Sequence, residues 1–140
     1  MDMLSFEKIW EDNEFYEIEF KATSEFADIK AKTYVIPEKI NELAKRLSSF
    51  PERKNDEFFW ENWKKGEGYT PYFSLGFKYN IYGHVEIEVY CEIDDGADLG
   101  NHNCCFFIRS EIGVVNRFGK SLLNMNIGEI GTKAEMNKID

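Results

Sequence analysis

The side chains that could carry chemistry are two histidines, three cysteines and the carboxylates around them. His102 lies near Asp98, Cys104 and Cys105, and His84 precedes them in the chain. Zinc would suit such ligands, but Cys104 and Cys105 are adjacent, and adjacent residues of a strand point to opposite faces. The chain has no C-x-x-C and no H-x-x-x-H spacing. We therefore expect no metal site and no cofactor.

Glu86 and Glu88 offer a second kind of chemistry. They alternate with apolar residues, which places both carboxylates on one face of a strand, ~7 Å apart by strand rise. Carboxylates can act as acid and base, so a hydrolase that uses His84 or His102 with them is one alternative. A solvated strand face lined by Glu is nonetheless common, and the chain has no G-x-S-x-G, no Walker loop and no dinucleotide fingerprint. We therefore predict that the protein is not an enzyme.

The segment Asp94-Asp95-Gly96-Ala97-Asp98 is similar in composition to a calcium-binding loop. It lacks the alternating ligand positions and the closing Glu of such a loop. We therefore interpret it as a solvated acidic turn, which could form part of an acidic edge that faces a partner.

Aromatic residues concentrate in Phe58-Phe59-Trp60-Glu61-Asn62-Trp63. Alternation puts Phe58 and Trp60 on one face and Phe59 and Trp63 on the other. One interpretation is that both faces are packed inside the protein. The other is an aromatic anchor ringed by acids, because Trp and Tyr are frequent hot-spot residues at interfaces. The predicted partner-binding residues are Trp60, Glu61, Trp63, Glu86, Glu88, Asp94, Asp95 and Asp98.

The charge favours a basic partner. The 140 residues include 26 acids and 17 bases, a formal net charge of −9, and residues 82–103 contain six acids and no Lys or Arg. A negative surface steers a basic protein toward it. Nucleic-acid binding is disfavoured, because it needs a basic surface that displaces counterions.

The remaining composition indicates a soluble protein. No apolar run approaches the ~20 residues that span a bilayer, and the first residues lack the pattern of a secretory signal. Three cysteines without the spacing of small secreted proteins favour reduced thiols. We expect a cytoplasmic protein with a protein partner and no membrane contact, present as a monomer or a homodimer.

Periodicity predicts an α+β fold. Residues 15–22 and 27–35 alternate as a hairpin, and further strands are expected over residues 72–81, 84–93 and 104–109. Helical spacing follows Pro37 until Pro51, and a second helix is expected after Ser110 as its N-cap. The predicted architecture is a mostly antiparallel sheet of five to seven strands with two helices on one face. A single domain would cover residues 1–126, with residues 127–140 as a loosely held tail.

Three motifs carry a resemblance to a known family: a Gly-His hairpin within residues 79–89, a Phe-Pro helix end at Phe50 and Pro51, and an Asn-Arg-x-Gly helix within residues 112–123. On these motifs the chain resembles small uncharacterised bacterial proteins related to the WapI-type immunity proteins of polymorphic toxin systems, over most of residues 15–126. The resemblance implies a cytosolic antidote or a domain of unknown function, and it brings no active site.

The predicted function is therefore non-catalytic: an acidic binding protein of the immunity type that neutralises a basic toxin. A small-ligand-binding or structural module is the alternative besides the hydrolase. It would be favoured by an apolar cavity lined by Trp60, Phe73 and Phe77.

Overall fold

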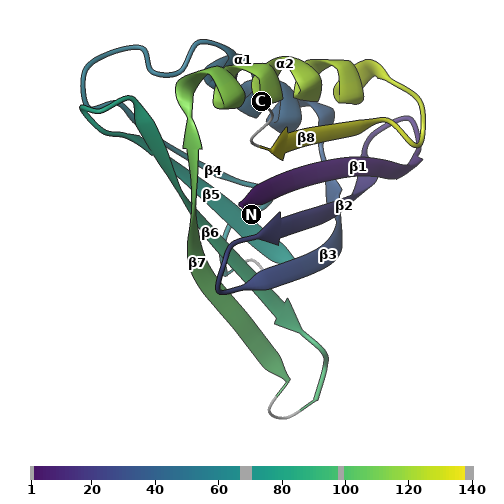
Figure 1. Cartoon of the computed structure of the whole chain (residues 1–140). Coiled ribbons are helices and arrows are strands. Elements are labelled where there is room, and N and C mark those ends of the chain that lie inside the picture. The colour runs from purple at the N-terminus through teal and green to yellow at the C-terminus, as the bar shows by residue number, and fades with distance from the viewer. Residues whose placement is uncertain (1, 67–70, 98–99, 138–140) are drawn as a thin grey trace.

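The computed structural model describes residues 2–66, 71–97 and 100–137 (Figure 1). These residues form two antiparallel sheets of four strands each and two helices. The first sheet has the order β3-β2-β1-β8 and consists of β1 (Met3–Glu11), β2 (Tyr16–Thr23), β3 (Asp28–Val35) and β8 (Lys133–Asn137). The second has the order β4-β5-β6-β7 and consists of β4 (Glu57–Glu61), β5 (Tyr72–Tyr79), β6 (His84–Asp94) and β7 (Asn101–Glu111). The helices are α1 (Pro37–Ser48) and α2 (Ile112–Ile127).

The sheets form because the strands alternate and are joined by short turns. In β2, Tyr16, Ile18, Phe20 and Ala22 are buried while the residues between them are half-exposed. Short connections between neighbouring strands produce antiparallel pairs, and every strand pair here is antiparallel. The predicted hairpin of β2 and β3 is thereby confirmed.

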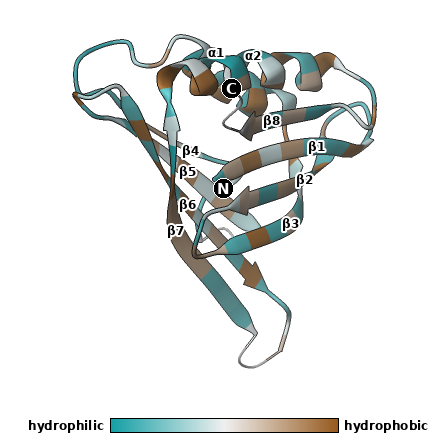
Figure 2. Cartoon of the chain, viewed as in Figure 1, coloured by the Kyte–Doolittle hydropathy of each residue, from teal (hydrophilic) through white to brown (hydrophobic). Residues whose placement is uncertain are grey.

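The core lies between the inner faces of the two sheets and the two helices. Phe20 of β2 stacks on Phe73 of β5 with ring centroids 4.1 Å apart, and Phe6 of β1 meets both Phe73 and Phe118 edge to face. Figure 1 shows α1 and α2 together across one end of both sheets. Hydropathy alternates along the strands, as Figure 2 shows, because each strand has one face in this core. No helix among the described residues is long and apolar enough to cross a membrane.

The α+β fold is confirmed, with two differences in arrangement. The strands divide between two sheets of four, whereas one sheet of five to seven was predicted. Ser110 belongs to β7, and the residue that precedes α2 is Glu111, whose side chain makes no cap hydrogen bond. Strand pairing therefore continues up to the helix, where the sequence predicted a cap.

The prediction of a loose C-terminal tail is wrong for the residues that form β8. This strand pairs with β1, and its Ala134 and Met136 are buried against the core. The strand is short, so only two apolar residues alternate within it. Its partner lies at the other end of the chain, and local periodicity does not reveal such a pairing.

A buried lysine secures the C-terminal end of α2. The Nζ atom of Lys8 donates hydrogen bonds to the carbonyls of Asn126 (3.2 Å) and Gly128 (2.7 Å) and lies 4.3 Å from the centroid of the Tyr16 ring. The last carbonyls of a helix have no partner within the helix, and a cation there also opposes the negative end of its dipole. Lys8 therefore joins β1 to the end of α2.

Replacing Lys8 by methionine is expected to lower the free energy of unfolding by about 2 kcal/mol, because two partly buried carbonyls lose their donor. Lys21→Met is the matched control, since Lys21 is half-exposed and its ion pair with Glu19 is 3.6 Å long. The control should change stability by less than about 0.5 kcal/mol. Urea denaturation of both variants measures the difference, and equal effects would contradict this role of Lys8.

Candidate functional site

The outward side chains of the second sheet form a face that we call the acidic face. Alternation turns the apolar residues of β4 to β7 inward and their neighbours outward. The outward residues include seven acids but only two bases. The acids are Glu57, Glu61, Glu86, Glu88, Glu92, Asp94 and Glu111, and the bases are Lys78 and Arg109.

The two bases lie in a single row across the sheet. In that row Glu57 pairs with Lys78, Lys78 with Glu86, and Glu86 with Arg109. Opposite charges placed directly across neighbouring strands attract one another. The charges of this row therefore cancel, and the excess negative charge lies in the other rows of the acidic face.

Four acids in the following rows have no outward Lys or Arg beside them on the strands: Glu61, Glu88, Glu92 and Asp94. Tyrosines hold two of them. The Tyr72 hydroxyl donates to Glu61 at 2.7 Å and the Tyr90 hydroxyl donates to Glu92 at 2.5 Å. Burial, followed by the bond to Glu61, raises the pKa of Tyr72, and the bond to Glu92 raises the pKa of Tyr90 to about 12. Both tyrosines therefore stay neutral donors that hold the two carboxylates in fixed positions.

An ammonium group of the chain itself already lies on this face. Lys65, in the loop after β4, extends over Tyr90 with its Nζ atom 4.5 Å from the ring centroid. An ammonium over an aromatic ring is attracted by the negative face of the ring. The surroundings of Tyr90 are thus suited to a lysine side chain.

Exposed phenylalanines flank a shallow depression on the same face. Phe59 of β4 and Phe107 of β7 are each 60% exposed, and they belong to one row with Gly76 and Glu88 between them. The depression is about 570 Å³ and forms over Gly76, which has no side chain. Aromatic side chains beside a depression are typical anchors of a protein interface.

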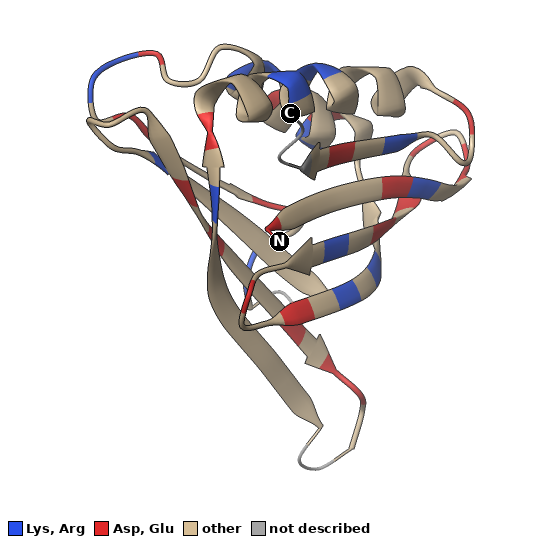
Figure 3. Cartoon of the chain, in the orientation of Figure 1, with Lys and Arg blue, Asp and Glu red and all other residues tan. Residues whose placement is uncertain are grey.

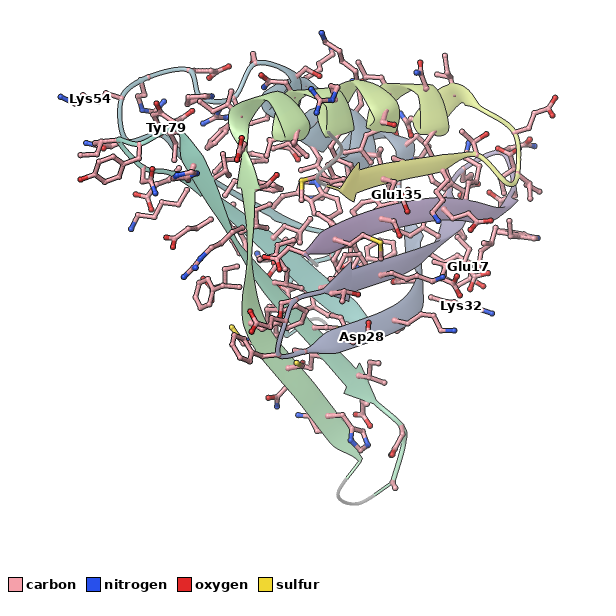
Figure 4. The ribbon with its side chains drawn as sticks, viewed as in Figure 1. Glu17, Asp28, Lys32, Lys54, Tyr79 and Glu135 are labelled. Atoms are coloured by element: carbon pink, nitrogen blue, oxygen red, sulfur yellow. The ribbon has the colours of Figure 1, made fainter. Side chains whose placement is uncertain are left out.

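The outer face of the first sheet differs in its charge. Its acids are Glu7, Glu17, Glu19, Asp28 and Glu135, and its bases are Lys21, Lys30, Lys32 and Lys133. Figure 3 shows both signs interspersed along these strands, and Glu17 and Lys32 extend from this sheet in Figure 4. The excess negative charge of the sheets therefore lies mainly on the second one.

The structure brings together only part of the predicted partner-binding set. Glu61, Glu86, Glu88 and Asp94 share the acidic face, and Asp95 lies at the tip of the β6–β7 hairpin, where its carboxylate bonds to His102 at 2.9 Å. Asp98 lies outside the described residues.

The structure places the two tryptophans of the set differently. Trp60 is wrong as a surface anchor, because it is 2% exposed and its indole donates to the Lys39 carbonyl at 2.9 Å. Trp63 is half-buried.

Several residues of the face were not predicted. Phe107 and Tyr90 lie in strands whose alternation was recognised, so the outward position of each could have been read from the sequence. Their proximity to Phe59 and Glu61 could not be read from the sequence, because it depends on the order and register of four strands.

The small-ligand alternative depended on an apolar cavity lined by Trp60, Phe73 and Phe77, and the structure packs all three side chains into the core. Phe73 is fully buried against Trp60, with ring centroids 5.5 Å apart. Phe77 contacts Phe50 and Phe58. These rings fill the core, which does not favour the small-ligand alternative.

The two histidines lie at opposite ends of the second sheet. His84 faces Glu111 across the β6–β7 pair, and with Glu86 and Arg109 these residues line an open depression of about 400 Å³. No described residue forms a hydrogen bond with the His84 ring. His102 bonds to Asp95, and hydrogen bonds from His102 and from a backbone N–H lower the pKa of that carboxyl. Within the described residues, no three His, Cys, Asp or Glu side chains are grouped closely enough to hold a metal ion.

Comparison with known proteins assigns no family to this chain. No family model matches the chain, and neither a curated protein nor a solved structure is similar to it. The resemblance to WapI-type immunity proteins therefore stays a prediction that rests on the three sequence motifs.

Proposed function

We propose that the acidic face binds a basic protein, and that this protein acts as an antidote that neutralises a basic toxin domain. The observation that carries the proposal is the segregation of charge between the two sheets. One outer face is nearly balanced, while the other places Glu61, Glu88, Glu92 and Asp94 around exposed aromatic rings.

Binding on such a face would have two contributions. The uncompensated carboxylates would steer a cationic partner and raise the association rate, which falls as salt screens the charges. Phe59 and Phe107 would be buried on contact and would slow dissociation, because buried aromatic residues supply much of the affinity of an interface. A lysine of the partner would take the position over Tyr90 that Lys65 occupies in the free protein.

The toxin is proposed as the partner because of the sequence resemblance. An immunity protein needs rapid and tight binding to a single target, and it needs no catalytic residues of its own. The direct test is co-expression of this chain with the toxin domain encoded beside its gene. Survival of the cells and a stable complex are expected, whereas undiminished killing without a complex would refute the proposal.

Reversing one charge on the acidic face tests where the partner binds. Glu88→Lys is expected to lower the association rate with the basic toxin domain about 10-fold at low salt. Glu17→Lys changes the net charge equally but lies on the first sheet, so it should lower the rate far less. Surface plasmon resonance at several salt concentrations measures both rates, and equal losses would show that only net charge matters.

A steric variant tests the same face without a change of charge. A Cβ atom at Gly76 would meet only the Cβ atom of Glu88, at 3.8 Å, which is an ordinary contact. Gly76→Val should therefore fold normally while it fills the depression between Phe59 and Phe107. Unchanged affinity for the toxin domain would place the interface elsewhere.

A hydrolase centred on His84 is the second candidate, because His84 and two glutamates line one depression. It predicts hydrolysis of a simple activated ester or phosphodiester above the buffer rate, and loss of that activity in His84→Ala. Equal rates for the two proteins would exclude it.

A further inference from the structure

The free edge of β7 is long and regular. β7 is the last strand of the second sheet, and its eleven residues pair one to one with β6 without a register shift. Figure 1 shows the β6–β7 hairpin extending past the strands of the first sheet. An uninterrupted edge of this kind is a template for pairing with another strand.

A hydrogen bond near the end of β7 shows which residues face the free edge. The backbone N–H of Arg109 donates to the Asp2 carboxylate at 2.7 Å, so it points away from β6. In an antiparallel pair the direction of the backbone groups alternates along the strand. The N–H and C=O groups of Phe107, Cys105, Asn103 and Asn101 therefore also point to the free edge, and no described residue bonds to them.

The other three edge strands carry features that discourage pairing. β3 has charged residues at Asp28, Lys30 and Lys32, and β4 and β8 are five residues long with charged side chains. Residues 101–107 of β7 contain no Asp, Glu, Lys, Arg or Pro. Natural sheets protect their edges with charges, Pro, bulges or short strands, and this part of β7 has none of these.

We propose that β7 pairs in antiparallel fashion with β7 of a second copy of this chain. Residues whose backbone groups point outward must pair with one another, and Asp2 occupies the edge at Arg109. The register that uses the whole free stretch pairs Asn101 with Phe107 and Asn103 with Cys105 of the other copy. Cys104 then lies on the two-fold axis, opposite Cys104 of the second copy.

The symmetric register and the neutral composition of residues 101–107 fit a second copy of the chain as the partner. Each chain carries a net charge of −9, so two copies repel one another wherever their acidic residues meet. Residues 101–107 bring no like charges together across the new pair, where such charges would destabilise it. The product is a continuous sheet of eight strands in which two acidic faces lie side by side.

Sedimentation equilibrium of the purified chain tests the dimer. A concentration-dependent dimer is expected, and added salt should strengthen it by screening the repulsion, whereas salt would weaken pairing with a basic strand. Asn103→Pro removes an N–H that the monomer does not use, and Asn103→Lys places a charge at the same edge. Both variants should be monomers with an unchanged thermal transition. A wild-type monomer at every attainable concentration, or a dimer unaffected by both variants, would overturn the proposal.

Thiol cross-linking tests the register. In the proposed pairing the two Cys104 residues form a pair without backbone hydrogen bonds, with Cα atoms about 4.5 Å apart, which a disulfide can span. Air oxidation with copper phenanthroline should therefore cross-link Cys105→Ser but not Cys104→Ser. Cys105 is the more exposed thiol, so random collisions would give the reverse result and would refute this register.

Discussion

Asp56→Asn is expected to lower the free energy of unfolding by about 3 kcal/mol, because it breaks a buried ion pair by removing one charge. The Asp56 carboxylate is fully buried and accepts hydrogen bonds from both terminal nitrogens of Arg46, at 2.7 and 2.8 Å, and from the N–H of Glu52 at 2.8 Å. An amide would turn a donor toward the guanidinium. The pair holds the segment between α1 and β4 in place. Chemical denaturation of the variant measures the loss.

Glu52→Gln is the control for this prediction. Glu52 also pairs with Arg46, but at 3.6 Å and with its side chain 49% exposed. Loss of the Glu52 charge should change the free energy of unfolding by less than about 1 kcal/mol. If the two variants were equally stable, Asp56 would contribute no more than Glu52 to the stabilising ion pair with Arg46.

The same pair makes stability depend on pH. The hydrogen bond from Arg46 lowers the pKa of Asp56 from 3.8 to about 2. A carboxyl whose pKa is lower in the folded state stabilises the fold above its unfolded pKa, and this contribution is lost as the pH falls. The stability of the wild type should therefore decrease between about pH 4 and pH 2, and the Asp56→Asn variant should show a smaller decrease there.

Gly119→Ala is expected to destabilise the protein by about 2 kcal/mol, although alanine is the better helix former. A Cβ atom at this position would lie 2.6 Å from the backbone nitrogen of Ser48 and 2.8 Å from the carbonyl of Ala44. These are backbone atoms of α1, so α1 and α2 would have to separate. Overpacking of this kind costs about 1–3 kcal/mol and exceeds the ~1 kcal/mol gained in helix propensity.

Gly113→Ala, in the same helix, is the matched control. Its Cβ atom would meet only the Arg117 side chain, at 3.5 Å. This variant should be more stable than the wild type by up to about 1 kcal/mol. Thermal unfolding of both variants should shift in opposite directions, and a shift in the same direction would contradict the close helix crossing.

The strands could be predicted because their local signal is strong. In β2, β3 and β6 apolar and polar residues alternate over at least eight residues, and each strand was found at close to its true bounds. The division into two sheets could not be predicted, because alternation shows which side of a strand is buried but not which strands are neighbours. The position of β8 could not be predicted for the same reason, since its partner β1 lies at the other end of the chain.

The candidate site was predictable in its charge more than in its shape. The outward carboxylates of β6 follow from alternation alone, and Glu86 and Glu88 lie where they were expected. Trp60 was misplaced because alternation gives two faces without saying which one meets the core. The large Trp60 ring fills the core, whereas the smaller Phe59 is exposed on the acidic face.

The most direct test of the central claim is nuclear magnetic resonance of the protein titrated with a lysine-rich peptide. Binding at the acidic face should shift the Phe59, Tyr90 and Phe107 ring signals, and these shifts should disappear at high salt, while Trp10 and Tyr34, exposed aromatic residues of the first sheet, stay unchanged. Shifts of Trp10 and Tyr34 in place of the other three would show that basic groups bind elsewhere, and would contradict binding at the acidic face.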